Sequence, residues 1–89
     1  MPAYYCYIVE CADGTFYTGW STDPERRALQ HSAGRGARYT RAHAPVRLVY
    51  VEAQPSRADA MRREVALKAM SRTRKRTLIA AYLSSEAVP

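Results

Sequence analysis

The segment from Tyr4 to Trp20 constrains the fold most, because two β-prone runs flank a tight-turn signal there. The runs YYCYIVEC and TFYTGW are rich in aromatic and β-branched residues, and Asp13-Gly14 between them is a typical hairpin turn. We therefore expect a β-hairpin with strands at about 4–11 and 15–20. The chain has 89 residues, which make one domain with a small core, near the low end for independent folding.

The length of the hairpin turn decides which side chains share a face of the sheet. With a two-residue turn, Tyr7 and Tyr17 face opposite sides. With a three-residue turn that has Gly14 in a left-handed bulge position, Tyr17 lies opposite Val9 and Gly19 lies opposite Tyr7. Only this second register places both phenols on one face with nothing bulky between them, and Gly14 suits the bulge.

Beyond the hairpin, capping residues and apolar periodicity predict helices and a third strand. Asp23 caps the first helix, Pro24 suits its first turn, and the helix ends before Gly34. The predicted remainder is a polar basic loop from Ser32 to Pro45, a strand at 46–51, a helix from Ser56 to about Met70, and a short last helix through Leu83.

These elements predict an α/β chain of the α+β type. Its core is a small three-stranded antiparallel sheet flanked by helices, in the order β-β-α-β-α-α. Phe16 and Trp20 are expected on the far face of the sheet from the two phenols, as core residues. One domain covers residues 1–83, and 84–89 are expected to form a frayed tail.

The formal charge of +6 indicates an anionic partner. Twelve of the fourteen basic residues are Arg, whose planar guanidinium binds phosphate as a fork, and no acidic residue occurs from Arg26 through Val51. A general preference for Arg over Lys would explain the arginines but not the missing acids. The charge pattern therefore favours binding to a phosphate backbone.

Other classes of protein are disfavoured by what the sequence contains. No apolar run approaches the roughly 20 residues that span a bilayer, and no secretory signal is present. Cys6 and Cys11 lie an odd number of residues apart in one predicted strand, so they point to opposite faces and cannot pair with each other. Free thiols are typical of a reducing compartment, so we expect the chain in the cytoplasm.

Three residues on the predicted helices are candidates for chemistry. Arg27 and His31 are four residues apart and share a helix face, from which both can hold a phosphodiester. Glu64 is the only carboxylate between Asp59 and Glu86, near the edge of an apolar stripe that faces the sheet. The alternative for Glu64 is a surface ion pair with Lys68, four residues on.

The basic loop is a candidate nucleic-acid contact. Its arginines Arg35, Arg38 and Arg41 can bind phosphates, and Tyr39 can stack on a base or ribose. In the alternative interpretation the loop is solvated and Tyr39 folds back on the domain. The later cluster RTRKR, residues 72–76, is expected to be a solvated helix face or an extension of the phosphate-binding track.

The ordered series YCYI, YTGWSTDPERRALQH, RLVYVE and REVALK resembles the GIY-YIG nuclease superfamily, and most closely its small stand-alone bacterial members. The resemblance covers about Tyr4 to Ile79. Its two signature triplets fall on Tyr5-Cys6-Tyr7 and Tyr17-Thr18-Gly19, and its other site residues fall on Arg27, His31 and Glu64. The chain departs from the family pattern at Tyr5, Cys6 and Thr18, and it has no Asn to match one found late in several branches.

The resemblance implies hydrolysis of phosphodiester bonds with one divalent cation, Mg²⁺ or Mn²⁺, held by Glu64. Arg27 would neutralise charge on the phosphoryl oxygens. Tyr17 is favoured as proton acceptor or water-orienting group, with Tyr7 supporting and His31 assisting, although a phenol with an ordinary pKa near 10 is a poor base. Lys68 joins Arg35, Arg38, Tyr39 and Arg41 as a candidate nucleic-acid contact.

The expected substrate is DNA, with RNA as an open alternative and branched or damaged DNA in repair or recombination as the candidate context. Two further hypotheses stay open: a non-catalytic nucleic-acid-binding module, and a nuclease subunit that is active only with a protein partner that recognises the substrate. The sequence does not indicate an oligomeric state.

Overall fold

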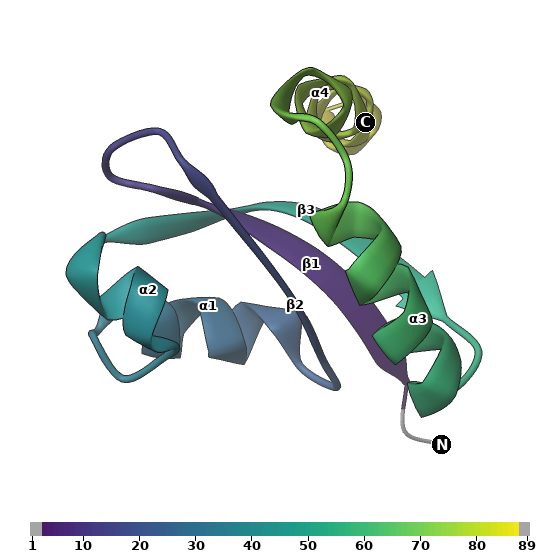
Figure 1. Cartoon of the computed structure of the whole chain (residues 1–89), viewed down its shortest axis with the longest axis horizontal. Helices are drawn as coiled ribbons and strands as arrows, with labels where there is room; N and C mark the ends of the chain where they lie inside the picture. The colour runs from purple at the N-terminus through teal and green to yellow at the C-terminus, as the bar shows by residue number, and fades with distance from the viewer. Residues whose placement is uncertain (1–2, 88–89) are drawn as a thin grey trace.

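A central strand with a neighbour on each side forms the sheet of the computed structural model, which describes residues 3–87 (Figure 1). All pairings are antiparallel, and the strand order is β2-β1-β3. The elements along the chain are β1 (Tyr4–Cys11), β2 (Phe16–Ser21), α1 (Pro24–Ser32), α2 (Arg38–Ala42), β3 (Val46–Gln54), α3 (Arg57–Lys68) and α4 (Arg72–Ala87). The predicted fold class is confirmed.

The hairpin adopts the three-residue-turn register. Tyr17 pairs with Val9 and Gly19 pairs with Tyr7, as the bulge prediction requires. The glycine at the bulge, Gly14, has φ +84°, in the left-handed region that a side chain disfavours. The two phenols therefore lie on one face of the sheet, and the missing side chain of Gly19 leaves room for the ring of Tyr7.

Side chains alternate between the two faces of β1 because successive residues of a strand point to opposite sides. Cys6 and Ile8 are fully buried in apolar clusters with residues of α3, α4 and β3. Tyr7 and Val9 are buried on the other face, against Ala28 of α1. Helices α1 and α2 thus lie on one side of the sheet, and α4 lies on the other (Figure 1).

Two sequence-based expectations about the core and the thiols agree with the structure. Phe16 and Trp20 pack against the clusters on the α3 and α4 face. Cys6 and Cys11 are free and buried. No helix in residues 3–87 combines the length and the apolar character needed to cross a membrane.

The predicted helix caps form. The Asp23 side chain accepts a hydrogen bond from the backbone N–H of Arg26 at 3.2 Å, and the hydroxyl oxygen of Ser56 accepts one from the N–H of Asp59 at 3.1 Å. These caps set where α1 and α3 begin. The residue at which each helix begins decides which of its side chains face the sheet.

The predicted element order lacked one helix. The segment predicted as a loop from Ser32 to Pro45 contains α2, a five-residue helix without a side-chain N-cap. Its stability comes from tertiary contacts, because Thr40 is fully buried and hydrogen-bonded to a side chain of α1. So short a helix has little intrinsic stability, and no local pattern predicts it.

The ends of two other elements also differ from the prediction. Strand β3 runs to Gln54, three residues beyond the predicted Val51. Residues 84–87, expected as part of a frayed tail, belong to the 16-residue helix α4, and 88–89 lie outside the described residues. The earlier turns of α4 are anchored on the sheet through Ile79 and Leu78, so each further residue extends an existing helix.

Candidate active site

A buried hydrogen bond joins the centre of the sheet to α1. The hydroxyl oxygen of Tyr7 lies 2.9 Å from Nε2 of His31, and the two side chains are 2% and 0% exposed. Tyr7 comes from the central strand, and His31 comes from the last turn of α1, which faces that strand. Sequence reasoning selected both residues, and the structure brings them into direct contact.

The far nitrogen of His31 is held by α2 and the segment before it. Nδ1 lies 2.6 Å from the hydroxyl oxygen of Thr40, and that hydroxyl donates to the carbonyl of Ala37 at 2.9 Å. We assign the proton to Nδ1 because the Thr40 hydroxyl donates its hydrogen to the Ala37 carbonyl and accepts at 2.6 Å, whereas the Ala37 N–H, which also points at Nδ1, is at 3.3 Å. Nε2 is then left to accept a hydrogen bond from Tyr7.

Burial sets the protonation states of this pair. Desolvation, with a smaller effect of Tyr17, raises the pKa of Tyr7 to about 12, although the charge of Arg27 opposes the rise. Desolvation and the positive charge of Arg27 lower the pKa of His31 below its ordinary value of 6.5. At neutral pH Tyr7 therefore keeps its proton and His31 is neutral, so the imidazole can accept one.

Tyr17 lies in a row of aromatic rings. Its ring centroid is 5.2 Å from that of His31 and 6.4 Å from that of Tyr39, which is stacked on His43 at 4.1 Å. Tyr39 also donates a hydrogen bond from its hydroxyl to the hydroxyl oxygen of Thr15 at 2.7 Å. Tyr39 therefore folds back on the domain, and its role as a nucleic-acid contact stays a prediction.

Arg27 and Glu64 shift the pKa of Tyr7 in opposite directions. Arg27 is half-buried on α1, donates to the side-chain oxygen of Gln30 at 2.9 Å, and lowers the pKa of both Tyr7 and His31. The Glu64 carboxylate raises the pKa of Tyr7, although its helix packs against the opposite face of the sheet. Tyr7, Tyr17 and His31 thus touch, Arg27 lowers the pKa of Tyr7 by its charge and by a side-chain hydrogen bond, and Glu64 raises it by its charge.

Glu64 shows both features that the sequence left as alternatives. Its carboxylate lies 3.7 Å from the ammonium nitrogen of Lys68, four residues on. Its side chain is nevertheless only 22% exposed, whereas that of Lys68 is 51% exposed, so a half-buried carboxylate lies beside an exposed ammonium group. A carboxylate in this position is shielded from water and still reachable by a cation.

The predicted nucleic-acid contacts are spread around the site. Arg35 and Arg38 are exposed, on the segment that precedes α2 and on its first residue. Arg41 belongs to α2, and its side chain lies outside the described part of the chain. Lys68 is exposed at the end of α3, beside Glu64. These assignments stay predictions.

Sequence reasoning missed the groups that hold the site in shape. Thr40 orients His31, and Gly36 leaves room for the imidazole, since a Cβ at position 36 would lie 1.9 Å from Nδ1. On α3, Arg63 forms hydrogen bonds to both oxygens of Glu52, at 2.7 and 3.0 Å, and so fixes the helix next to Glu64. A glycine or threonine in a polar loop gives no signal of such a role.

The donor groups fit a hard divalent cation. Within residues 3–87, no group of three or more His, Cys, Asp or Glu side chains could enclose a metal ion. Mg²⁺ does not need such an enclosure, because it keeps several waters and binds through one or two carboxylates together with substrate phosphates. Glu64 can supply that single carboxylate.

Comparisons with known proteins show which family the chain resembles. The model of the GIY-YIG catalytic domain matches residues 3–77. The chain is 54% identical to the UPF0213 protein DP2720 of Desulfotalea psychrophila, over 90% of this chain and 74% of that protein. It is 48% identical to the UPF0213 protein VNG_2274C of Halobacterium salinarum, over 84% of this chain and 97% of that protein.

Two solved structures share the fold. The NMR structure of the UPF0213 protein BH0048 from Bacillus halodurans has a TM-score of 0.56 and 47% identity, covering 89% of this chain and 84% of that one. The NMR structure of protein EF2693 from E. faecalis has a TM-score of 0.57 and 35% identity, covering 100% and 91%. The chain therefore belongs to the GIY-YIG family, whose catalytic domain is of the nuclease type and acts on nucleic acid.

Proposed function

We propose that the chain is a divalent-metal-dependent endonuclease that hydrolyses phosphodiester bonds in DNA. The observation that carries the proposal is the buried contact between Tyr7 and a neutral His31. Tyr7 also lies within electrostatic range of both Arg27 and Glu64. A phenol and an imidazole in contact form a path for a proton. The Arg27 guanidinium near them can bind a phosphate group.

The proton path starts at the attacking water. Tyr7 is a poor base while it holds its own proton, because burial raises its pKa to about 12. It can accept a proton from water only as it passes its own to Nε2 of His31, 2.9 Å away. Thr40 then stabilises the imidazolium through Nδ1–H. We therefore assign the proton transfer to Tyr7. Tyr17, which the sequence alone favoured as the proton acceptor, would orient the water.

Arg27 and Glu64 handle the charge of the phosphate. The Arg27 guanidinium would neutralise charge that develops on the phosphoryl oxygens. GIY-YIG nucleases generally use a divalent metal ion, and Glu64 would hold Mg²⁺ or Mn²⁺ here. When bound there, the ion would supply Lewis-acid polarisation of the scissile phosphate and charge stabilisation for the leaving oxygen.

The finer assignments belong to the same proposal. DNA is the proposed substrate, in particular branched or damaged DNA in repair or recombination. The cytoplasm is the proposed compartment, because a reducing environment suits the two buried free thiols, Cys6 and Cys11.

Purified protein, DNA and Mg²⁺ test the proposal. Wild type should cleave the DNA, and Arg27→Ala and Glu64→Gln should abolish cleavage while DNA binding persists. The matched control is Arg62→Gln, which removes one exposed Arg that is already paired with Asp59 at 2.8 Å and should leave cleavage unchanged.

Two outcomes would replace the proposal with another function. DNA binding without cleavage in any divalent metal would favour a non-catalytic binding module, in which Lys68 permanently neutralises Glu64. Cleavage that appears only when cell extract is added would favour a nuclease subunit that needs a partner.

A further inference from the structure

The basic residues divide into those with a carboxylate partner and those without. The described ion pairs of Arg and Lys are Glu10 with Arg47, Asp59 with Arg62, Glu52 with Arg63, and Glu64 with Lys68, at 2.7, 2.8, 2.7 and 3.7 Å. Arg74, Lys75 and Arg76 of α4 form no ion pair among the residues that the structure describes. The sequence explains this, since no acidic residue occurs from Met70 to Ser85.

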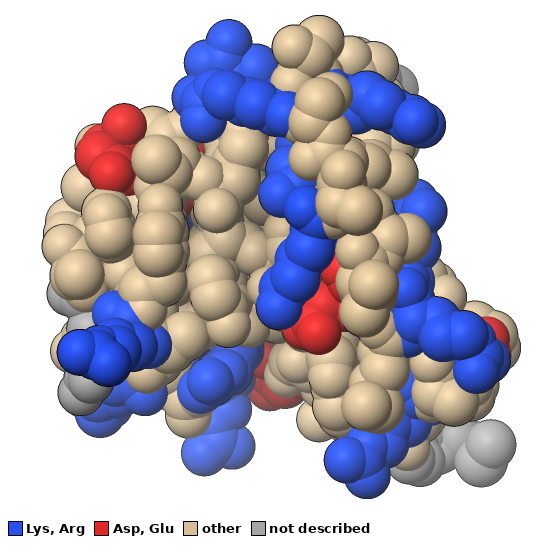
Figure 2. All heavy atoms as spheres, viewed as in Figure 1, with Lys and Arg blue, Asp and Glu red and all other residues tan. Residues whose placement is uncertain are grey.

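Arg26, Arg27, Arg57 and Arg72 also form no described ion pair, and the other described Arg and Lys side chains without one lie in two places. We call Arg74, Lys75 and Arg76 the α4 arm, and Arg35 with Arg38 the α2 arm. The α2 arm has no ion pair among the described residues either, and all its side chains and most of the α4 arm are exposed. Figure 2 shows Lys and Arg side chains over α4 at the top of the molecule and over the α2 side at the left.

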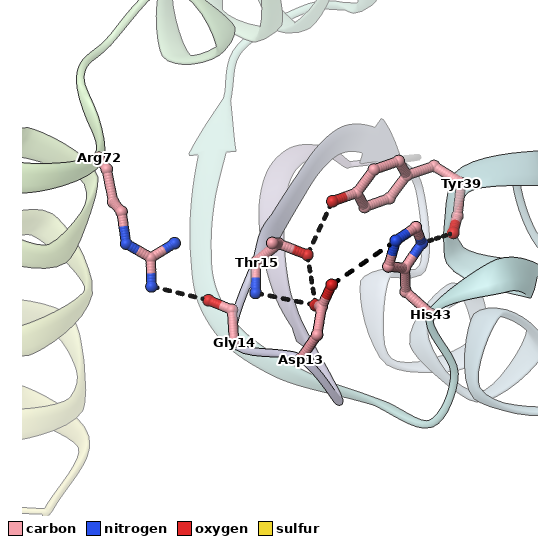
Figure 3. A network of polar contacts seen from close by, with 6 residues as sticks. All are labelled: Asp13, Gly14, Thr15, Tyr39, His43 and Arg72. Carbon is pink, nitrogen blue, oxygen red and sulfur yellow. Dashed lines mark hydrogen bonds and ion pairs between the residues drawn. The ribbon is translucent and has the colours of Figure 1, made fainter.

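The β1–β2 turn holds the α4 side in place. Arg72, in the first turn of α4, donates a hydrogen bond to the backbone carbonyl of Gly14 at 2.9 Å (Figure 3). The same guanidinium lies over the ring of Phe16, 4.9 Å from its centroid. The start of the α4 arm is thus fixed to the hairpin that carries Tyr7 and Tyr17.

The same turn holds the α2 side. Tyr39 donates to the hydroxyl oxygen of Thr15 at 2.7 Å, and Nε2 of His43 lies 3.6 Å from the Asp13 carboxylate (Figure 3). The backbone N–H of Ala12 donates to the carbonyl of His43 at 3.0 Å. Both arms therefore have set positions relative to the candidate active site, on opposite sides of the sheet.

Lys75 of the α4 arm lies within electrostatic range of Lys68, which is beside Glu64. Burial, and in addition the nearby positive charge of Lys68, lowers the pKa of Lys75 below its ordinary value. Lys68 in turn contacts the carboxylate of Glu64. Crowded ammonium groups repel each other in the free protein, and a bound phosphate would relieve that repulsion.

The side chains of the arms suit a phosphate backbone better than exposed bases. Single-stranded nucleic acid is held largely by stacking of its bases on free aromatic rings. Among the large apolar side chains described as exposed, the only aromatic one is Tyr39, and its ring is already stacked on His43 at 4.1 Å. Neither arm offers a free aromatic face, which favours a duplex.

We propose that the α4 arm is a second phosphate-binding surface, and that the two arms together hold the backbone of double-stranded DNA across the β1–β2 hairpin. The inference rests on the proposed function for its choice of DNA as the substrate. It adds that the DNA is double-stranded and that the α4 arm binds its backbone.

Binding to a DNA duplex, measured by fluorescence anisotropy in EDTA over a range of salt concentrations, tests the proposal. The variant is Arg74→Gln with Arg76→Gln, and the control is Arg47→Gln with Arg62→Gln, which removes the same charge from exposed residues that have carboxylate partners. The α4 variant should bind about tenfold more weakly, and its salt dependence should fall by about 2 in the log–log slope. The control should bind within about twofold of wild type.

Several results would overturn the proposal. One is an equal loss of duplex affinity in the two double variants, which would show that only the net charge of the protein matters. A second is unchanged duplex binding in the α4 variant, whether or not the variant loses binding to vesicles of anionic phospholipid. A third is tighter binding by wild type to a single strand than to a duplex of equal charge. Circular dichroism must show equal helix content in all variants.

The result is independent of cleavage. Loss of duplex binding in the α4 variant, with no cleavage by wild type in Mg²⁺, would support the second surface and refute the endonuclease. Cleavage by wild type, with unchanged duplex binding in the α4 variant, would support the endonuclease and refute the second surface.

Discussion

The two faces of β1 show how one strand serves two purposes. On the α1 face, Tyr7 is hydrogen-bonded to His31, which is hydrogen-bonded to Thr40, so the buried polar groups form a connected chain. On the α3 and α4 face, Ile8 is fully buried among apolar side chains. The buried hydroxyl of Thr18 on this face is the only buried side-chain polar atom without a hydrogen-bond partner among the described residues.

Adjacent residues of β1 thus belong to a candidate site and to an apolar core. Buried polar groups are costly unless they are hydrogen-bonded, so the α1 face is stable because its network is complete. The other face contributes stability by burying apolar surface. Substitutions on the two faces should therefore have separable effects, in the following order of expected change in the free energy of unfolding.

Ile8→Ala should cause the largest loss of stability. The side chain is 0% exposed, and truncation of such a residue leaves a cavity that costs about 2–5 kcal/mol. Urea unfolding measures the change, and the cleavage rate per folded molecule should stay near that of wild type. A loss of cleavage larger than the loss of folded protein would show that the faces are not separable.

Gly36→Ala should destabilise the α1 face. A Cβ at this position would lie 1.9 Å from Nδ1 of His31, so the imidazole or the backbone must move, at a cost of about 1–3 kcal/mol. Cleavage should fall as well, because the contact with Tyr7 is disturbed. Gly34→Ala is the control: it introduces strain at φ +78° but meets no atom within 4 Å, so it should cost stability without loss of cleavage per folded molecule.

His31 should make stability depend on pH. Its pKa in the folded protein lies below the ordinary value of 6.5, because burial and Arg27 disfavour its charged form. As pH falls below 6.5, the unfolded chain gains a proton that the folded protein does not bind, so the free energy of unfolding falls, by at most about 1.4 kcal/mol per pH unit.

Urea unfolding between about pH 5 and 7 measures this slope, above the range where carboxylates titrate. His31→Gln should flatten the profile, whereas His43→Gln should retain it. A profile that stays unchanged in His31→Gln would refute the assignment of a buried neutral imidazole.

Thr18→Val should have the smallest effect, and it should stabilise the protein. Valine has nearly the shape of threonine and removes the unsatisfied hydroxyl, so we expect a gain of about 1 kcal/mol. The same exchange at Thr40 should destabilise the protein, since that hydroxyl is bonded to His31 and Ala37. A loss of stability in Thr18→Val would show that the Thr18 hydroxyl is hydrogen-bonded after all.

Much of this architecture is predictable from local chemistry. The hairpin itself follows from its turn residues, the bulge that Gly14 suits is one of two registers they allow and the one that places Tyr7 and Tyr17 on one face, and Asp23 set the start of α1. The helix α2 was not predictable, because its stability depends on Thr40 meeting an imidazole nine residues earlier. Tertiary partners of this kind leave no periodic trace in the sequence.

In the candidate active site, too, some features follow from sequence spacing and others depend on tertiary packing. Spacing on α1 put Arg27 and His31 on one helix face, but the choice of Tyr7 over Tyr17 as the partner of His31 depends on where α1 lies against the sheet. The position of Glu64 depends likewise on how α3 packs, and its neighbour Arg63 holds that helix to Glu52.

The cleavage rate of Tyr7→Phe, compared with that of Ile8→Ala in the same Mg²⁺ buffer and expressed per folded molecule, is the most direct test. The two residues are neighbours on β1 and face opposite sides. If the face toward α1 carries out hydrolysis through the phenol, Tyr7→Phe should cleave about 10²–10⁴-fold more slowly while Ile8→Ala keeps the wild-type rate. Equal rates in Tyr7→Phe and wild type would contradict that role.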